Sequence, residues 1–153
     1  DELRFDNLED LNSPVDYTYS FTIEDYVNEV GKFKFLKVPW ADAAEPDRAL
    51  TYETRAYPYD YLPGVDVEHE VIEIELPAGY EPLELGEDVR ISSSVADYQL
   101  NFSYQNGVIR GERRLTNKKD RVQPEEYEAF RSFFRRVIKE DSRFILLQQV
   151  IQN

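Results

Sequence analysis

The last quarter of the chain, residues 122–153, constrains the fold most, because it joins a helical pattern directly to a strand pattern. Pro124 suits the first position of a helix, where its missing N–H is not needed. Apolar side chains then recur at helical spacing, at Tyr127, Phe130, Phe133, Phe134, Val137 and Ile138. We predict a helix over residues 124–140 and a final strand over residues 144–150. Such a wide stripe predicts the domain's own core; the alternative is a face that docks a partner.

Before this helix the chain is a series of short alternating segments separated by turns. In the clearest one, residues 97–104, the side chains of Tyr98, Leu100, Phe102 and Tyr104 share one face. The Asn106-Gly107 pair that follows predicts a hairpin to residues 108–116, because a type I′ turn needs two residues with positive φ. The other predicted strands are residues 16–23, 33–38, 50–57, 68–76 and 89–95, with a loop at 39–48 and a turn-rich connection at 59–66.

These patterns favour a sandwich or an open barrel. We predict a mainly β fold, α+β at its margin: an antiparallel β-sandwich with one C-terminal amphipathic helix and a final strand. A length of 153 residues predicts one domain, spanning residues 1–153. Because the chain does not begin with methionine, we expect it to be a processed chain or a fragment of a larger multidomain protein.

Composition excludes several classes of partner and chemistry. A net charge of −13 repels phosphate backbones and anionic membrane surfaces, so we expect no nucleic-acid partner. No apolar run approaches the ~18 residues of a membrane helix, so we expect no membrane insertion. The absence of cysteine removes disulfides, thiolate nucleophiles and Cys-ligated zinc.

Few residues stand out as candidates for chemistry. His69, the one histidine, is predicted to point outward from a strand between two acids, and no catalytic residue, metal site or cofactor is predicted. The acids at 65–70 and 86–88 could bind calcium, but neither has the spacing of an EF-hand loop, and scattered acids in so acidic a chain meet by chance. Trp40 lies beside Pro39 in a predicted loop and is the one candidate for an exposed binding aromatic, although strand aromatics mostly pack in cores.

Four segments carry a family resemblance. They are the extended stretch 15–23, the stretch ETRAYPYD at 53–60, the strand IELPAGY at 74–80 and the helix EYEAFRSFF at 126–134. With them the chain resembles the C-terminal β-rich module, a domain of unknown function, of bacterial transglutaminase-like proteins. The resemblance implies a papain-like transglutaminase core before this module, in a protein exported from a Gram-negative bacterium. The catalytic Cys-His-Asp set belongs to that core and has no counterpart here.

The resemblance therefore implies a non-catalytic accessory, structural or interaction domain, with the neighbouring transglutaminase-like domain as its partner. It also implies a periplasmic, cell-surface or secreted location. The alternative is a stand-alone carbohydrate- or protein-binding β-sandwich, which an exposed aromatic strip near Trp40 would favour. A third hypothesis, a carboxylate-dependent hydrolase, requires two acids within roughly 5–10 Å of each other in a cleft.

Overall fold

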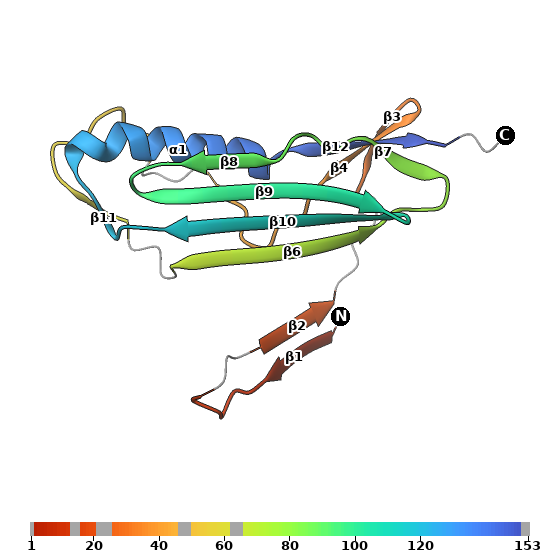
Figure 1. Cartoon of the computed structure of the whole chain (residues 1–153), viewed down its shortest axis with the longest axis horizontal. Helices are drawn as coiled ribbons and strands as arrows, with labels where there is room; N and C mark the ends of the chain where they lie inside the picture. The colour runs from red at the N-terminus through yellow and green to blue at the C-terminus, as the bar shows by residue number, and fades with distance from the viewer. Residues whose placement is uncertain (1, 13–15, 21–25, 46–49, 62–65, 151–153) are drawn as a thin grey trace.

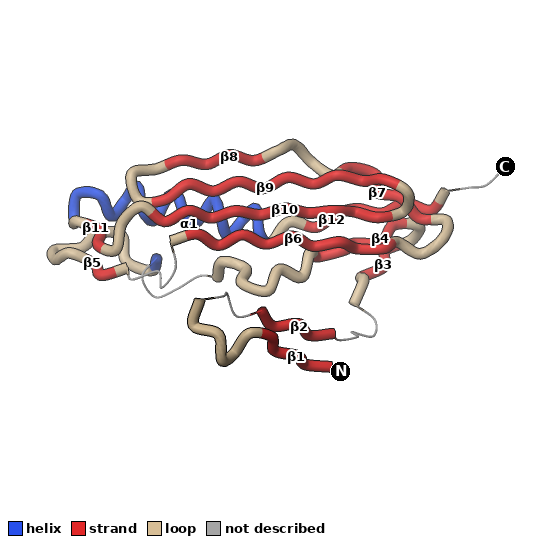
Figure 2. The backbone as a smooth tube through the Cα atoms, turned by 60° about the horizontal axis from the view of Figure 1, so that its bottom comes forward, coloured by secondary structure: helices blue, strands red, loops and turns tan. Residues whose placement is uncertain are grey.

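The computed structural model describes residues 2–12, 16–20, 26–45, 50–61 and 66–150. Strands predominate in it, all their pairings are antiparallel, and one substantial helix precedes a last strand (Figure 1). These features confirm the predicted fold class. A short hairpin of β1 (Glu2–Asp6) and β2 (Asp16–Ser20) lies away from the main body in Figures 1 and 2. Residues 21–23 of the predicted strand 16–23 lie outside the described residues.

The large sheet has four strands in the order β6-β10-β9-β8. They are β6 (Val67–Glu75), β8 (Val89–Ser92), β9 (Ala96–Gln105) and β10 (Val108–Asn117). The predicted hairpin between β9 and β10 is confirmed: Asn106 and Gly107 form its turn with φ values of 53° and 82°. The faces predicted for 97–104 are also confirmed, because Tyr98 and Leu100 are buried while Gln99, Asn101 and Ser103 are exposed.

A second four-stranded sheet has the order β3-β4-β12-β7. Its strands are β3 (Asn28–Val30), β4 (Phe33–Lys37), β7 (Tyr80–Glu84) and β12 (Phe144–Gln149). The sequence predicts β4 and β12 but not β3 or β7, which form the two edges. Pro82 in β7 fits this placement, because a proline cannot donate a ladder hydrogen bond and is tolerated at an edge.

Helix α1 (Tyr127–Asp141) follows a 3₁₀ turn, η2 (Pro124–Glu126), and leads almost directly into β12. The helix and the second sheet lie behind the same face of the large sheet, so the molecule has two layers (Figure 2). The predicted stripe faces this interior: all its members are buried except Ile138, which is partly buried and packs against the core. The prediction that the stripe is the domain's own core is confirmed.

The predicted strand at 50–57 is wrong. The segment is turns and coil, and the nearest strand is the two-residue β5 (Tyr59–Asp60), paired with β11 (Arg121–Val122). Side-chain donors of the helix hold the segment instead: Tyr127 Oη and Arg131 Nη1 both donate to the Tyr52 carbonyl, at 3.1 and 2.6 Å. The alternating pattern was present, but helix contacts took the place of a partner strand.

Candidate functional site

Trp40 is a core residue, which corrects the hypothesis of an exposed binding aromatic. Its side chain is 7% exposed, and its ring centroid lies 6.0 Å from that of Phe102. The cause is Gly111 on β10: a Cβ there would lie 3.0 Å from the Trp40 ring and 2.6 Å from the Phe102 ring. The missing side chain opens a slot that the indole fills, so the loop at Trp40 folds inward.

His69 lies on the outer face of the large sheet, as predicted. Its Nε2 atom is 2.9 Å from Glu112 Oε1, and Arg110 Nη1 donates to the other oxygen of Glu112 at 2.7 Å. The pKa of the Glu112 carboxyl is lowered, first by Arg110 and then by His69. The three side chains form an exposed cross-strand group, a type of contact that contributes little to stability.

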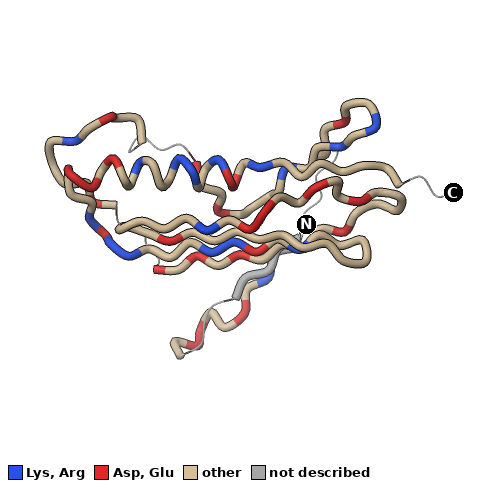
Figure 3. The backbone as a smooth tube through the Cα atoms, turned by 45° about the horizontal axis from the view of Figure 1, so that its top comes forward, with Lys and Arg blue, Asp and Glu red and all other residues tan. Residues whose placement is uncertain are grey.

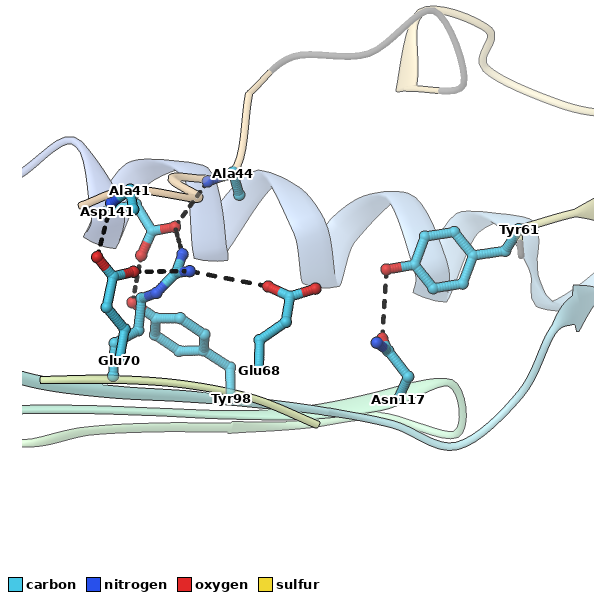
Figure 4. Close-up of polar contacts among 9 residues, drawn as sticks. Ala41, Ala44, Tyr61, Glu68, Glu70, Tyr98, Asn117 and Asp141 are labelled. Atoms are coloured by element: carbon cyan, nitrogen blue, oxygen red, sulfur yellow. Dashed lines mark hydrogen bonds and ion pairs between the residues drawn. The ribbon is translucent and has the colours of Figure 1, made fainter. Parts of the chain in front are cut away.

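The most unusual group in the interior is ionic. Asp141, the last residue of α1, is 1% exposed, and Arg113 on β10 is 2% exposed. Asp141 Oδ1 accepts from the Tyr98 hydroxyl at 2.6 Å, and Oδ2 accepts from Arg113 Nη1 at 2.7 Å and from the Ala44 N–H at 2.8 Å (Figure 4). Buried charges need such pairing. The carboxylate thus joins the helix, two strands and a loop.

Two glutamates of β6 complete this group. Glu70 lies directly opposite Arg113 in the sheet register, and its Oε2 is 3.3 Å from Arg113 Nη2. Its other oxygen accepts from the Ala41 N–H at 2.6 Å. Glu68 Oε2 is 3.7 Å from the same Nη2 atom. We call these five side chains, Glu68, Glu70, Tyr98, Arg113 and Asp141, the Arg113 cluster.

Burial controls the protonation of the Tyr98 hydroxyl in this cluster. Desolvation, and then the negative charge of Asp141, raise the pKa of Tyr98 far above its ordinary value. The hydroxyl therefore stays protonated and serves as a donor to Asp141 at any physiological pH. Glu68 behaves differently, because burial raises the pKa of its carboxyl although Arg113 acts in the opposite direction.

A pocket of about 460 Å³ opens beside the Arg113 cluster. Its described lining combines aromatic rings, aliphatic side chains, carboxylates and one guanidinium: Asp42, Ala43, Ala44, Glu45, Leu50, Tyr59, Tyr61, Glu68, Arg113, Leu115, Phe130 and Phe134. Tyr61 donates its hydroxyl to Asn117 Oδ1 at 3.2 Å, and burial raises its pKa to about 12. In Figure 4 Glu68 is the member of the Arg113 cluster nearest to Tyr61, and both lie in the space between α1 and the large sheet. We call the pocket lined by these twelve residues the aromatic–acidic pocket.

Comparison with known protein families finds one family that matches most of the chain. Residues 32–147, which run from the start of β4 into β12 and include the whole pocket, match a family described as a domain of unknown function with a solved structure (DUF3858). The chain belongs to the DUF3858 family. The β1–β2 hairpin lies outside the matched DUF3858 region.

Other comparisons say less about this DUF3858 chain. No curated protein matches it. A solved structure from Parabacteroides distasonis ATCC 8503, described as a "putative protease", matches with a TM-score of 0.62 and 19% sequence identity. The match covers 76% of this chain but only 23% of the Parabacteroides protein. At this identity the likeness shows a shared fold.

Sequence reasoning did not single out three charged residues in or beside the pocket of this DUF3858 domain: Glu68, Arg113 and Asp141. Arg113 occupies an inward position of β10, between Gly111 and Leu115, and Asp141 continues the stripe four residues after Val137. A charge at an apolar position was therefore a usable signal for a buried ion pair. Glu68 carried the same kind of signal, because it lies on the inward face of β6 with Ile72 and Ile74.

The described residues restrict what the site can hold. Among them no three His, Cys, Asp or Glu side chains converge in a way that could hold a metal ion. In the same part of the chain, every helix is too short or too polar to cross a membrane. Within the pocket, the side chains that remain for ligand contact are aromatic rings and carboxylates, which suit binding of an apolar or cationic group.

Proposed function

We propose that this domain is a non-catalytic accessory module of a larger, exported bacterial protein, in which it packs against a transglutaminase-like core. The fold comparison carries the proposal: a domain of this fold accounts for 23% of the length of the Parabacteroides protein, so the fold occurs as one part of a larger chain. The four sequence segments that resemble the transglutaminase-associated module support the same context. A periplasmic or cell-surface location belongs to this proposal.

The state of the Arg113 cluster supports a structural role. Both oxygens of Asp141 accept hydrogen bonds, and Glu70 is tied to Arg113 and to the Ala41 N–H. A general acid or base must instead reach the proton that it transfers in a substrate. Trp40 is buried, so the observation that would favour the carbohydrate-binding alternative is missing.

The outer face of α1 is the surface that we assign to the neighbouring core. Arg131, Arg135, Arg136 and Lys139 gather there on a chain whose net charge is −13 (Figure 3). Arg135, Arg136 and Lys139 are exposed and make no ion pair or hydrogen bond with any residue that the structure describes. Such a local basic stripe fits an acidic patch on the adjoining domain, because complementary charge gives orientation and specificity. The negative field of the rest of the chain disfavours a membrane or nucleic acid at this face.

The experiment compares the DUF3858 domain with the transglutaminase-like domain that we propose as its neighbour. Both are produced separately and as the native two-domain chain, and binding is measured by calorimetry at two salt concentrations. We expect binding that weakens with salt and that the double change Arg135→Glu and Arg136→Glu abolishes. Arg90→Glu and Arg114→Glu, which reverse charge on the outer face of the large sheet, are the matched control. Equal loss in both variants would contradict the assigned face, and the absence of any binding would contradict the accessory role.

Catalysis is tested separately on the pure domain. We expect no turnover of peptide, amide or γ-glutamyl substrates. Turnover that His69→Ala abolishes would overturn the non-catalytic assignment. Turnover that survives this change would favour the hypothesis of a carboxylate pair, for which Asp42, Glu45 and Glu68 are the first substitutions to make, because they line the pocket.

A further inference from the structure

The aromatic–acidic pocket has an apolar body. Phe130 and Phe134 of α1 are buried, and their ring centroids lie 4.9 Å apart. Tyr61 packs its ring against both, at 5.2 and 5.3 Å, and Tyr59 contacts Phe130 at 5.7 Å. The half-buried tyrosines leave ring surface at the pocket wall. A volume of about 460 Å³ falls in the range of small-molecule and side-chain pockets.

Of the carboxylates that line this pocket, Glu68 is the half-buried one, whereas Asp42 and Glu45 are exposed. Glu68 is 28% exposed, and its nearest cation, Arg113 Nη2, lies 3.7 Å away, beyond hydrogen-bond distance. No residue in the described part of the chain donates a hydrogen bond to it. Arg113 cannot move closer without loss elsewhere, because its Nη1 atom is held by Asp141 and its Nη2 atom lies closer to Glu70. Glu68 therefore retains its acceptor capacity toward the pocket.

The charge around the pocket is predominantly negative. Among the residues that the structure describes, five carboxylates line the pocket or surround its inner end, against the one guanidinium of Arg113; they belong to Asp42, Glu45, Glu68, Glu70 and Asp141. Asp42 and Glu45 are exposed at the mouth. In such a setting an anion is repelled, and a neutral group gains no charge attraction from Glu68. A cation gains both charge attraction and contact with the faces of the tyrosine rings.

We propose that the aromatic–acidic pocket binds an alkylammonium group, a primary amine on a short apolar chain. The ammonium donates to Glu68 while the methylene chain lies on Phe134 and the tyrosine rings. A lysine side chain of a protein partner and a free aliphatic amine share this chemistry. Lysine combines a long apolar stem with a charged head in this way. Alkylammonium recognition is a property of the domain itself and does not depend on the proposed docking through α1.

The test uses the isolated chain and three ligands of the same chain length: pentylamine, pentanol and pentanoate. Binding is followed by titration calorimetry and by the NMR shifts of the Tyr59 and Tyr61 ring protons. We expect saturable binding of pentylamine only, with shifts at both tyrosines. Equal binding of pentanol would show an apolar pocket without charge recognition. Tighter binding of pentanoate, or no saturable amine binding, would overturn the proposal.

Two substitutions make the test specific to Glu68. Glu68→Gln keeps the shape of the side chain, and it should weaken pentylamine binding about tenfold or more, because a charge-assisted hydrogen bond is lost. Glu73→Gln, on the outward side of the same strand, should leave the affinity unchanged. Equal effects of the two would mean that only net charge matters, which contradicts a built site. Circular dichroism confirms that each variant is folded.

Two further ligands identify the source of the amine. One is a peptide with a single internal lysine and acetylated and amidated ends; the other is the same peptide with acetyl-lysine. Stronger binding of the lysine peptide than of pentylamine would identify a protein side chain as the ligand. Binding of pentylamine without binding of the peptide would identify a free amine. Binding of the acetyl-lysine peptide with equal affinity would contradict ammonium recognition.

Discussion

Helix α1 is held by two different kinds of contact along its length: near its start it packs against the segment after β5, and at its end it contacts the large sheet. Near its start the contact is aromatic, with Phe130 and Phe134 packed against Tyr61 at centroid distances of 5.2 and 5.3 Å. At its end the contact is one carboxylate, Asp141, held by Tyr98 and Arg113. Apolar contact contributes free energy in rough proportion to area and tolerates adjustment. A buried ion pair offsets its own desolvation only when both charges and all donors are in place. The aromatic part therefore supplies stability, and the charged end fixes where the helix stops.

The largest loss of stability is expected from a substitution that removes the cation at the charged end of the helix. Arg113→Ala would leave Asp141 buried without its cation and would also remove the partner of Glu70. We expect a loss of about 4–5 kcal/mol in the free energy of unfolding, measured by urea denaturation. The double change Arg113→Met and Asp141→Leu removes both charges and should cost less than Arg113→Ala alone. A double variant as unstable as Arg113→Ala would contradict the buried-pair interpretation.

The next effect concerns the aromatic end. Phe130→Ala should cost about 3–4 kcal/mol, because the ring is almost fully enclosed and its removal leaves a cavity. Phe134→Ala should cost less, since Phe134 is 8% exposed and Phe130 only 2%. The conservative change Phe130→Leu should be tolerated far better than Asp141→Asn, if the two ends differ as described. Comparable losses of stability for these two conservative variants in the same urea titration would contradict the difference between the aromatic and the charged end of α1.

A smaller loss of stability is expected when a single hydrogen bond to Asp141 is removed at the charged end. Tyr98→Phe keeps the buried ring and removes only the hydroxyl that donates to Asp141. We expect a loss of about 1.5–3 kcal/mol, the usual range for a hydrogen bond to a charged group. The thermal midpoint and the urea midpoint both report it. A change below about 0.5 kcal/mol would mean that Arg113 and the Ala44 N–H satisfy Asp141 without the tyrosine.

The smallest effect depends on pH. Burial raises the pKa of Glu68 above its ordinary value of 4.5, so the folded state binds a proton more readily than the unfolded state. The resulting penalty is absent below the unfolded pKa and grows as pH rises through the folded pKa. Glu68→Gln removes it and should be more stable than the wild type at pH 7 but not at pH 4. Because 28% of the side chain is exposed and water screens it, we expect a difference below about 1 kcal/mol. A difference that is independent of pH would show that the charge of Glu68 is not responsible.

Local signals explain what the sequence predicts well. Alternation in residues 97–104 and the Asn106-Gly107 turn are properties of neighbouring residues, and both appear in the structure. The edge strands β3 and β7 carry weaker signals, because one is three residues long and the other contains Pro82. The segment 50–57 has a strand-like pattern, but Tyr52 is held by α1. That outcome depends on tertiary contacts that periodicity cannot show.

The candidate site is predictable only in part. Arg113 and Asp141 each stand at a position where the pattern calls for an apolar residue, so each could be marked as unusual. That they pair with each other depends on how α1 lies over β10. The pocket adds residues from four separate parts of the chain, and nothing in the spacing of Asp42, Glu68 and Phe134 brings them together. Trp40 was misplaced as an exposed candidate because the slot above Gly111 exists only after β9 and β10 have paired.

The position of β12 has a consequence for the order in which this domain folds. Strand β12 lies between β4 and β7, so neither of those strands has its main partner until residue 149 has been synthesised. Asp141 similarly reaches Ala44 across 97 residues of sequence. Contacts between such distant residues slow folding, because the entropy of loop closure is lost before they form. The β9–β10 hairpin can form on the ribosome, whereas the second layer must wait for the C-terminal strand. We therefore expect the nascent chain to expose two unpaired edges until β12 has been synthesised.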